Sequence, residues 1–169
     1  MQNHTHLRVR LARLDEAAHL SELALRSKAS WGYDAGFMAA CVPSLTLTVE
    51  QMQRQSVFVI EAATDIAGFG SLRIDGDEAE LTNLFIEPWA KRQGYGKQLW
   101  DHAVTLAQAS GVKHIRIESD PFAEAFYLTM GARRIGDVPS DAIPGRRIPL
   151  LSFAVPPPAD SSRVKKPGP

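Results

Sequence analysis

One central stretch of the chain alternates between strand-like and helix-like segments in an order that few folds accommodate. Leu84–Ile86 is apolar and has the character of a strand end, and residues 91–97 form a loop with glycine at positions 94 and 96. Apolar residues at helical spacing then predict a helix over Gln98–Ser110, and His114–Ile117 predicts a further strand. Because a helix joins the two strands, we expect them to run parallel in one sheet. The chain is therefore predicted to have an α/β fold.

An antiparallel meander is expected to precede this unit. Val57–Ile60 is β-branched and aromatic, as buried strands are, and Thr64–Asp65 marks a turn into Ala67–Ile74. Asp75–Gly76 favours a tight hairpin turn into Glu80–Ile86. The other expected elements are a strand Val9–Leu11, a helix from the N-cap Asp15 to about Ser27, a helix Ala35–Cys41, a helix over about Ala123–Met130 and a strand Ile148–Phe153.

Size and charge limit the possible classes of protein. The chain has 169 residues, which is the size of one domain; we expect that domain to span residues 1–155 and the Pro-, Ser- and Lys-rich residues 156–169 to form a disordered tail. The 19 basic and 19 acidic side chains give a net charge of zero, so no long-range field attracts nucleic acid or an acidic membrane. Met1–Arg13 lacks the apolar run of a secretory signal. We expect a cytoplasmic protein with no nucleic-acid partner and no membrane partner.

The cysteine and histidine content argues against a metal site. Cys41 is the only cysteine, so no intramolecular disulfide can form. The 5 histidines are dispersed, and none of them forms a cluster at ligand spacing. We expect no metal, and we expect Cys41 to be a buried thiol rather than a nucleophile, because no histidine is recognisably paired with it.

The glycine loop has the features of a phosphate-binding site. Its backbone amides would converge at a helix N-terminus, where the helix dipole favours negative charge, and Gly94 and Gly96 would let the main chain approach a diphosphate. A dinucleotide fingerprint would need a third glycine where Leu99 stands, and a Walker A loop would need Ser or Thr after Lys97, where Gln98 stands. An ordinary turn remains an alternative on the glycine pair alone.

The spacing of residues in the loop makes the sequence resemble a known family. Lys91, Gly94 and Gly96 align with the motif [QR]-x-x-G-x-[GA], which follows a strand and opens a helix in the GCN5-related N-acetyltransferase (GNAT) family. Lys91 stands where that motif has Arg or Gln, with Arg92 beside it. Leu84–Ile86 occupies the position of the family's L-x-V segment.

A second block downstream extends the resemblance. Ala123, Tyr127 and Gly131 keep the register of the family's N-x-x-A-x-x-x-Y-x-x-x-G-F block, and Asp120 replaces the Asn at its start. The matched elements follow one another in the family's order and cover about residues 80–132. The resemblance implies a three-layer α/β/α domain with a mixed β-sheet that splays between the strands ending at Ile86 and Ile117.

The resemblance also implies that acetyl-CoA is the co-substrate and that an acetyl group is transferred to a primary amine of a small molecule or peptide. The residues expected to bind the cofactor are Leu84, Phe85, Ile86, Lys91, Arg92, Gln93, Gly94, Tyr95, Gly96, Lys97, Asp120 and Ala123. The family's habits also make a homodimer possible.

Two residues are candidates for proton transfer. Tyr127 matches the position at which many family members have a tyrosine that protonates the departing thiolate, and a phenol with a pKa of about 10 keeps its proton at neutral pH. Its alternative role is that of a packed helix aromatic. Glu80 lies four residues before Leu84, where some members have a glutamate as general base; the alternative is a solvated carboxylate at a strand end. No covalent acyl-enzyme is required.

The acceptor side is less defined in the sequence. Trp31, Tyr33 and Asp34 combine aromatics with one carboxylate, which suits an amine with an apolar body, and Asn83 is a candidate for orienting water or substrate. Core packing is an equal alternative for Trp31. Arg146 and Arg147 either bind an acidic group of the substrate or face solvent, and the loop around them favours solvent.

Two other classes of function remain open at this stage. One is a catalytically inactive acyl-CoA-binding regulatory module, and the other is a binder of a different phosphate or nucleotide. Only the transferase predicts both a selective response to acetyl-CoA and turnover of an amine.

Overall fold

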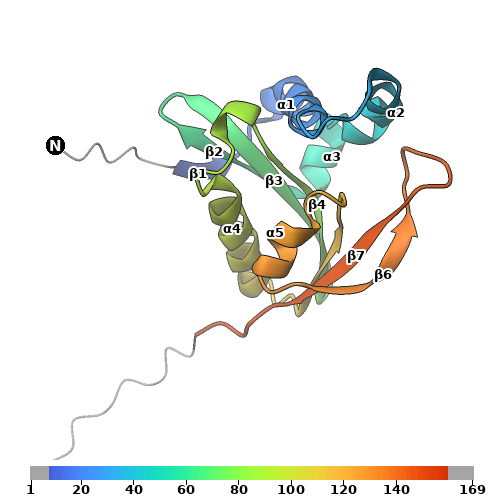
Figure 1. Cartoon of the computed structure of the whole chain (residues 1–169). Coiled ribbons are helices and arrows are strands. Elements are labelled where there is room, and N and C mark those ends of the chain that lie inside the picture. Colours follow the sequence, from blue (N-terminus) through green and yellow to red (C-terminus); the bar gives the residue numbers. More distant parts are fainter. Residues whose placement is uncertain (1–7, 160–169) are drawn as a thin grey trace, which may run out of the picture.

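A seven-stranded mixed sheet forms the middle layer of the protein in this computed structural model, which describes residues 8–159 (Figure 1). The strand order is β1-β2-β3-β4-β5-β7-β6. All neighbouring strands are antiparallel except β4 and β5. The strands are β1 (Arg8–Leu11), β2 (Ser56–Ala62), β3 (Asp65–Asp75), β4 (Glu78–Ile86), β5 (His114–Glu118), β6 (Arg133–Pro139) and β7 (Arg147–Ala154).

Helices cover both faces of this sheet. The α-helices are α1 (Ala17–Ala29), α2 (Ala35–Leu45), α3 (Val49–Arg54), α4 (Tyr95–Ala109) and α5 (Glu124–Thr129), and two short 3₁₀ turns span Leu14–Glu16 and Pro88–Ala90. α1, α2 and α3 lie on one side of the sheet, and α4 and α5 lie on the other (Figure 1). The predicted three-layer α/β/α arrangement is confirmed.

Strand β2 shows how the sequence produces two cores. Phe58 and Ile60 pack in the core beneath α4, whereas Val57 and Val59 pack in the core beneath α1. All of them are buried because successive side chains of a strand point to opposite faces. A strand with an apolar residue at every position therefore requires a helix layer on each side, as the run 57–60 does here.

The splay of the sheet lies between β4 and β5. These strands pair only from Glu78 opposite His114 to Glu80 opposite Arg116, and then they separate. β4 continues to Ile86, still paired with β3 along its other edge. The predicted splay is confirmed, and it leaves the Leu81–Ile86 edge of β4 without a strand partner.

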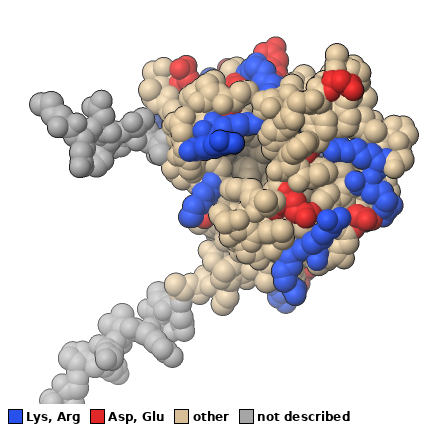
Figure 2. Space-filling model, viewed as in Figure 1, with Lys and Arg blue, Asp and Glu red and all other residues tan. Residues whose placement is uncertain are grey.

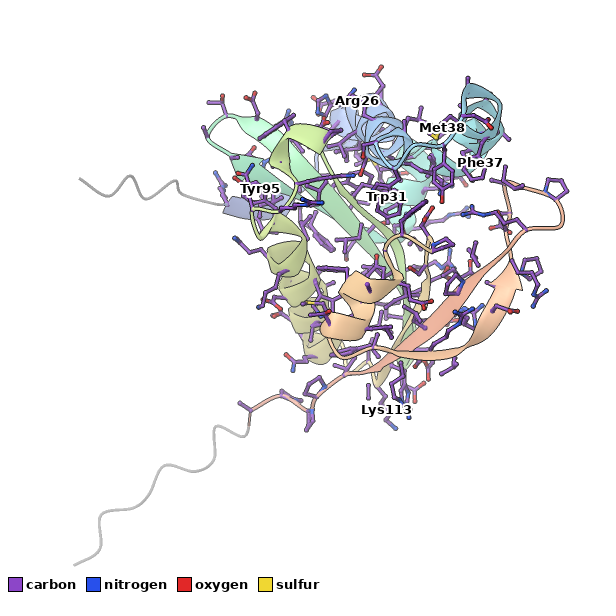
Figure 3. All side chains as sticks on the ribbon, viewed as in Figure 1. Arg26, Trp31, Phe37, Met38, Tyr95 and Lys113 are labelled. Carbon is purple, nitrogen blue, oxygen red and sulfur yellow. The ribbon has the colours of Figure 1, made fainter. Side chains whose placement is uncertain are left out.

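An ion pair between Arg26 and a buried carboxylate fixes α1 to the end of β4. Arg26 of α1 donates from Nη2 to Glu87 Oε1 at 2.5 Å, and the Glu87 side chain is buried beside the 3₁₀ turn that precedes the glycine loop. Arg26 projects from the outer helix layer in Figure 3. This contact holds α1 next to the splayed strand that it has to cover.

Several element boundaries differ from the sequence expectations. α1 begins at Ala17 and not after Asp15, because a 3₁₀ turn comes first and the Glu16 carboxylate, rather than that of Asp15, accepts the Arg13 backbone N–H at 2.7 Å. α2 runs through Pro43 to Leu45 instead of ending at Cys41. α4 begins at Tyr95 and not at Gln98, so Gly96 and Lys97 belong to its first turn.

Two elements were not predicted at all. α3 carries a recognisable signal, a capping box in which Thr48 Oγ1 accepts from Gln51 N at 3.2 Å and Gln51 Oε1 accepts from Thr48 N at 3.0 Å. β6 carries almost none, because it is an exposed edge strand that pairs only with β7 and has no buried apolar face. Of the predicted tail, Pro156–Ala159 has no helix or strand, and residues 160–169 lie outside the described range.

Close packing of β3 against β4 predicts that Gly68→Ala destabilises the fold. An added Cβ would lie 2.7 Å from the backbone oxygen of Phe85 and 2.6 Å from Ile86 Cδ1. We expect a loss of about 1–3 kcal/mol in the free energy of unfolding, measured by urea denaturation. Gly136→Ala in β6 is the matched control, since a Cβ there would meet nothing within 4 Å, and a change within about 0.5 kcal/mol is expected. Equal stability of Gly68→Ala and the wild type would contradict the close strand approach.

Candidate active site

A cleft of about 580 Å³ opens where β4 and β5 separate. Its walls come from α1 and α2 on one side, from the glycine loop and the start of α4 on another, and from the segment between β5 and α5. The face shown in Figure 2 is hollowed near its centre, with basic side chains beside the hollow. The loop between β6 and β7 closes the remaining side.

The glycine loop has a backbone suited to an anion. Arg92 and Gly94 have φ angles of 62° and 85°, and Gly94 is the residue before the first turn of α4. The first helical bond runs from Gln98 N to Gly94 O at 3.2 Å, so the amides of Tyr95, Gly96 and Lys97 have no partner within the helix. Unpaired amides at a helix N-terminus form a ready site for a phosphate.

The loop's side chains are distributed unevenly around this site. Arg92 and Lys97 line the cleft, and Lys97 also pairs with Asp101 at 2.6 Å. Gly94, Tyr95 and Gly96 line it as well. Gln93 does not, because its amide turns back to donate to Trp89 O at 3.1 Å.

Lys91, the residue that departs from the family motif, reaches α1 instead of the loop. Its Nζ donates to Ser30 Oγ and, at 3.4 Å, to Ser27 O, and it lies 5.2 Å from the centre of the Trp31 ring. Burial lowers the pKa of Lys91 below its usual value. The lysine therefore ties the glycine loop to the end of α1, where Trp31 lines the cleft.

The free edge of β4 forms the floor of the cleft. Leu84, Phe85 and Ile86 all line it. Their other edge is paired with β3, in the register Gly70 to Leu84 and Gly68 to Ile86. Backbone groups on an unpaired strand edge are available to a ligand that carries amides, as the pantetheine arm of coenzyme A does.

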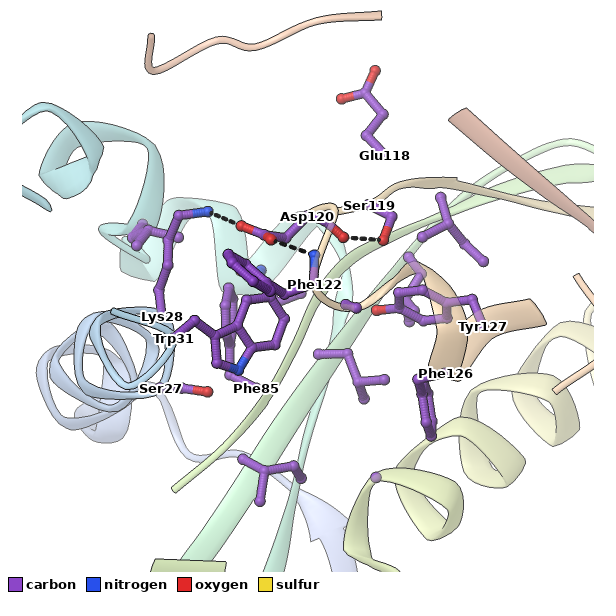
Figure 4. Close-up of a pocket in the computed structure, with 18 of the residues that line it drawn as sticks. Ser27, Lys28, Trp31, Phe85, Glu118, Ser119, Asp120, Phe122, Phe126 and Tyr127 are labelled. Carbon is purple, nitrogen blue, oxygen red and sulfur yellow. Dashed lines mark hydrogen bonds and ion pairs between the residues drawn. The ribbon is translucent and has the colours of Figure 1, made fainter. Parts of the chain in front are cut away.

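Tyr127 is both a packed aromatic and a cleft residue. Its ring is 6% exposed and contacts Trp100 and Phe126, with ring centres 5.9 and 5.2 Å away. Its hydroxyl points from α5 into the cleft (Figure 4). Burial, and to a smaller extent the charge of Asp120, raise the pKa of Tyr127 well above its usual value, so the hydroxyl keeps its proton.

Asp120 faces α1 and is occupied by protein groups. Its carboxylate accepts from Lys28 Nζ at 2.8 Å and from Phe122 N at 2.9 Å (Figure 4). It also accepts from the Tyr33 hydroxyl at 2.9 Å. Ala123, three residues on, lines the cleft. Burial, followed by the bond to Asp120, raises the pKa of Tyr33 to about 12.

Of the four residues predicted to bind the acceptor substrate, two line the cleft and two do not. Trp31 and Asn83 line the cleft, and Trp31, two residues beyond the end of α1, lies between that helix and the sheet (Figure 3). Tyr33 does not line it but holds Asp120, which does. Asp34 does not line it either, because its carboxylate caps α2 by accepting from Phe37 N at 2.8 Å.

A bulge in β4 places an extra polar residue in the floor. Ser71 and Leu72 of β3 pair with Asn83 and Leu81, so Thr82 is left over between them. Thr82 and Asn83 both hydrogen-bond the buried Ser71 side chain, at 2.6 and 2.7 Å, and both line the cleft. Of these two residues, only Asn83 was a candidate from the sequence.

Glu80, the predicted general base, lies outside the cleft, whereas Glu118, which was not predicted, lines it. Glu80 does not line the cleft: it lies where β4 and β5 are still paired, and its carboxylate pairs with Arg73. Glu118, at the end of β5, lines the cleft beyond the point of separation and pairs with Arg116 at 3.0 Å. The alternation of buried Ile115 and Ile117 in β5 could have indicated that Glu118 faces away from the α4 core.

Cys41 is buried and also lies in the cleft wall, so the prediction of a buried thiol is confirmed. Between residues 8 and 159, no three His, Cys, Asp or Glu side chains gather in an arrangement that could hold a metal ion. In the same range, none of the helices combines the length and the apolar character needed to cross a bilayer.

The sequence pattern of the acetyltransferase (GNAT) domain family matches residues 34–142, which include the loop, the splayed strands and the segment up to the β6–β7 loop. The chain belongs to the GNAT family. The predictions of this family and of an N-acyltransferase are confirmed.

Solved structures share the fold of this GNAT domain. The PaiA N-acetyltransferase of Thermoplasma acidophilum, in complex with coenzyme A, matches with a TM-score of 0.71 at 17% identity over 88% of this chain and 98% of that one. The ribosomal-protein-S18-alanine N-acetyltransferase of Escherichia coli matches with 0.67 at 18% identity over 92% and 97%. The yncA protein of Salmonella typhimurium with its cofactor acetyl-CoA matches with 0.64 at 16% identity over 89% and 95%.

The backbone of the GNAT loop predicts a specific effect of Gly94→Ala. A φ of 85° strains any residue with a Cβ, so the amides of the first turn of α4 would be displaced. We expect acetyl-CoA to bind about tenfold more weakly in calorimetry. Gly111→Ala is the matched control, because Gly111 has a φ of 74° at the other end of α4: it should lose stability but not affinity. Equal affinity losses in the two variants would contradict a phosphate site at the loop.

Proposed function

We propose that this domain transfers the acetyl group of acetyl-CoA to a primary amine of a small molecule or peptide by direct attack in a ternary complex. One observation carries the proposal: the unpaired amides in the first turn of α4, the free edge of β4 and the Tyr127 hydroxyl all face a single cleft. Family membership supports the chemistry, and the coenzyme complexes of two structural neighbours support the co-substrate.

The residues of the cleft fit the co-substrate. The amides from Tyr95 to Lys97 would hold its diphosphate, with Arg92 supplying positive charge, and the edge of β4 from Leu84 to Ile86 would pair with the amides of its pantetheine arm. When bound, it supplies an activated acetyl group as a thioester. Lys91 and Asp120 also line the cleft, but their charged groups are already bonded to α1 and the residues after it.

Tyr127 would act as the acid. As the bond between amine nitrogen and acetyl carbon forms and the carbon–sulfur bond breaks, the hydroxyl gives its proton to the departing sulfur. Burial raises the pKa of this phenol, but it also raises the proton affinity of a thiolate that leaves into the same dry surroundings. The hydroxyl is therefore protonated when it is needed.

Glu118 is our candidate for the base that takes the proton of the amine, directly or through water. It is a carboxylate of the cleft lining beyond the strand separation. Asp120 is less suited, because Lys28, Tyr33 and a backbone amide already use its oxygens.

Replacing Tyr127 by Phe should separate turnover from binding. We expect kcat to fall by about 10²-fold or more, because the proton donor is lost while the ring packing is kept. Acetyl-CoA affinity in calorimetry should stay within about twofold, since the change leaves the amides of the glycine loop and the packing of the ring in place. An unchanged kcat would exclude Tyr127 as the acid.

The two glutamates can be compared directly. Glu118→Gln should lower kcat by about 10²-fold at neutral pH and abolish the acidic limb of the rate profile, because the amide cannot accept a proton. Glu80→Gln, the matched change outside the cleft, should leave both nearly unchanged. The opposite ranking of the two variants would assign the base to Glu80.

The function itself is tested by a thiol-release assay with acetyl-CoA over amines, amino acids, polyamines and peptides, together with calorimetry against ATP and NAD. Selective binding of acetyl-CoA with release on at least one amine supports the proposal. Binding without release on any amine would favour the inactive regulatory module, and a preference for ATP or NAD would favour the nucleotide binder.

A further inference from the structure

The β6–β7 loop brings one arginine into the cleft and keeps its neighbour out. The loop is closed by Ser140 N donating to Arg146 O at 2.7 Å, and Gly145 has a φ of 79°. The Arg146 side chain is 21% exposed and lines the cleft. Arg147 is 56% exposed and pairs with Asp137 at 2.5 Å, away from the lining. The sequence expectation that both face solvent is correct only for Arg147.

Aromatic rings fix the Arg146 guanidinium in place. Its carbon lies 4.9 Å from the centre of the Phe37 ring and 5.4 Å from that of Tyr33, and these two rings stack on each other at 4.0 Å. Nη2 donates to the Tyr33 hydroxyl at 2.8 Å. Stacking holds a planar guanidinium in one orientation, so its remaining N–H donors are pre-organised.

The charges around Arg146 are unbalanced. Arg146 Nη2 and Lys28 Nζ lie 3.9 and 2.8 Å from the same carboxylate oxygen of Asp120. That single carboxylate already accepts from Lys28, Tyr33 and Phe122 N, so two largely buried cations share one anion. Glu118 pairs with Arg116, and Asp141 of the loop is exposed. A buried guanidinium with unused donors is suited to a bidentate carboxylate.

An apolar wall of aromatic side chains lies beside Arg146 and Lys28 in the cleft. The Trp31 and Phe122 rings contact edge to face with their centres 5.4 Å apart, and Phe122 is 62% exposed although it lines the cleft (Figure 4). The centre of the Tyr33 ring lies 5.6 Å from that of Phe122. An exposed aromatic beside a polar anchor is typical of a surface that receives a ligand.

We infer that Arg146 binds a carboxylate of the acceptor, so that the acceptors are amino-acid-type amines that carry a carboxylate in addition to the reacting amino group. The apolar body of the acceptor packs against Trp31 and Phe122. The amine of the acceptor points toward Tyr127 and Glu118, and its carboxylate points toward Arg146. This inference rests on the proposed function and names the substrate class of the same site.

The test compares each acid with its primary amide. Wild-type enzyme is assayed for thiol release with α-amino acids, including aromatic ones, with ω-amino acids up to aminohexanoate, and with the amide of each. We expect kcat/KM to be at least about tenfold higher for the acid in the best pair. Amides that are turned over as well as their acids would overturn the inference and leave the transferase intact.

Arg146→Gln should remove the preference. We expect its kcat/KM to fall by about tenfold to a hundredfold for the best acid and to stay within about threefold for the amide. Arg146→Lys keeps the charge without the planar fork and should lie between the two. Arg147→Gln, the matched change outside the cleft, should leave both acceptors unchanged.

Equal losses for acid and amide in Arg146→Gln would mean that the arginine only holds the loop, and this would also overturn the inference. If Arg146→Gln does not fold, the acid-to-amide ratio of Arg146→Lys decides by the same criterion. If acetyl-CoA binds but no amine causes thiol release, the proposed transferase function itself is wrong. A second readout in the presence of coenzyme A is the melting temperature, which the best acid should raise in the wild type and not in Arg146→Gln.

Discussion

The early separation of β4 from β5 determines everything else about the cleft. After Glu80 and Arg116 the two strands no longer pair, and the β4 edge that results lines the cleft instead of contacting another strand. Backbone groups without partners are costly in a protein interior, so such an edge persists only where a ligand or water can satisfy them. The sheet thus provides a binding surface made of main chain, which tolerates wide variation in the side chains around it.

A second organising feature is the carboxylate of Asp120, which joins three distant parts of the chain. Lys28 comes from α1, Tyr33 from the segment before α2, and Arg146 reaches the same cluster from the β6–β7 loop. The family's Asn at this position can donate a hydrogen bond, whereas an ionised aspartate only accepts. Its replacement by Asp therefore changes what the position can gather, and here it gathers cations and a phenol.

Local patterns in the sequence predicted the local structure well. The apolar run Val57–Ile60, the hairpin at Asp75–Gly76 and the glycine loop all carry short-range signals, and each lies where it was expected. The start of α4 was placed too late because Gly96, a poor helix former, sits in its first turn. Glu118 was overlooked although strand alternation turns it away from the α4 core, because its place in the cleft depends on where β4 and β5 separate. Arg146 was expected to face solvent because its place in the cleft depends on a contact across the fold with Tyr33, which lies 113 residues earlier.

Helix α4 has a further consequence for how the two parts of the sheet act as one body. Leu99, Trp100 and Ala103 share a core with Phe58 and Leu72 from one part and with Ile115, Ile117 and Leu151 from the other. The helix therefore connects the two parts of the sheet through side-chain packing where hydrogen bonds between β4 and β5 are absent. Since the same helix starts at the glycine loop, a ligand held at its first amides is anchored to the element that packs against both parts of the sheet.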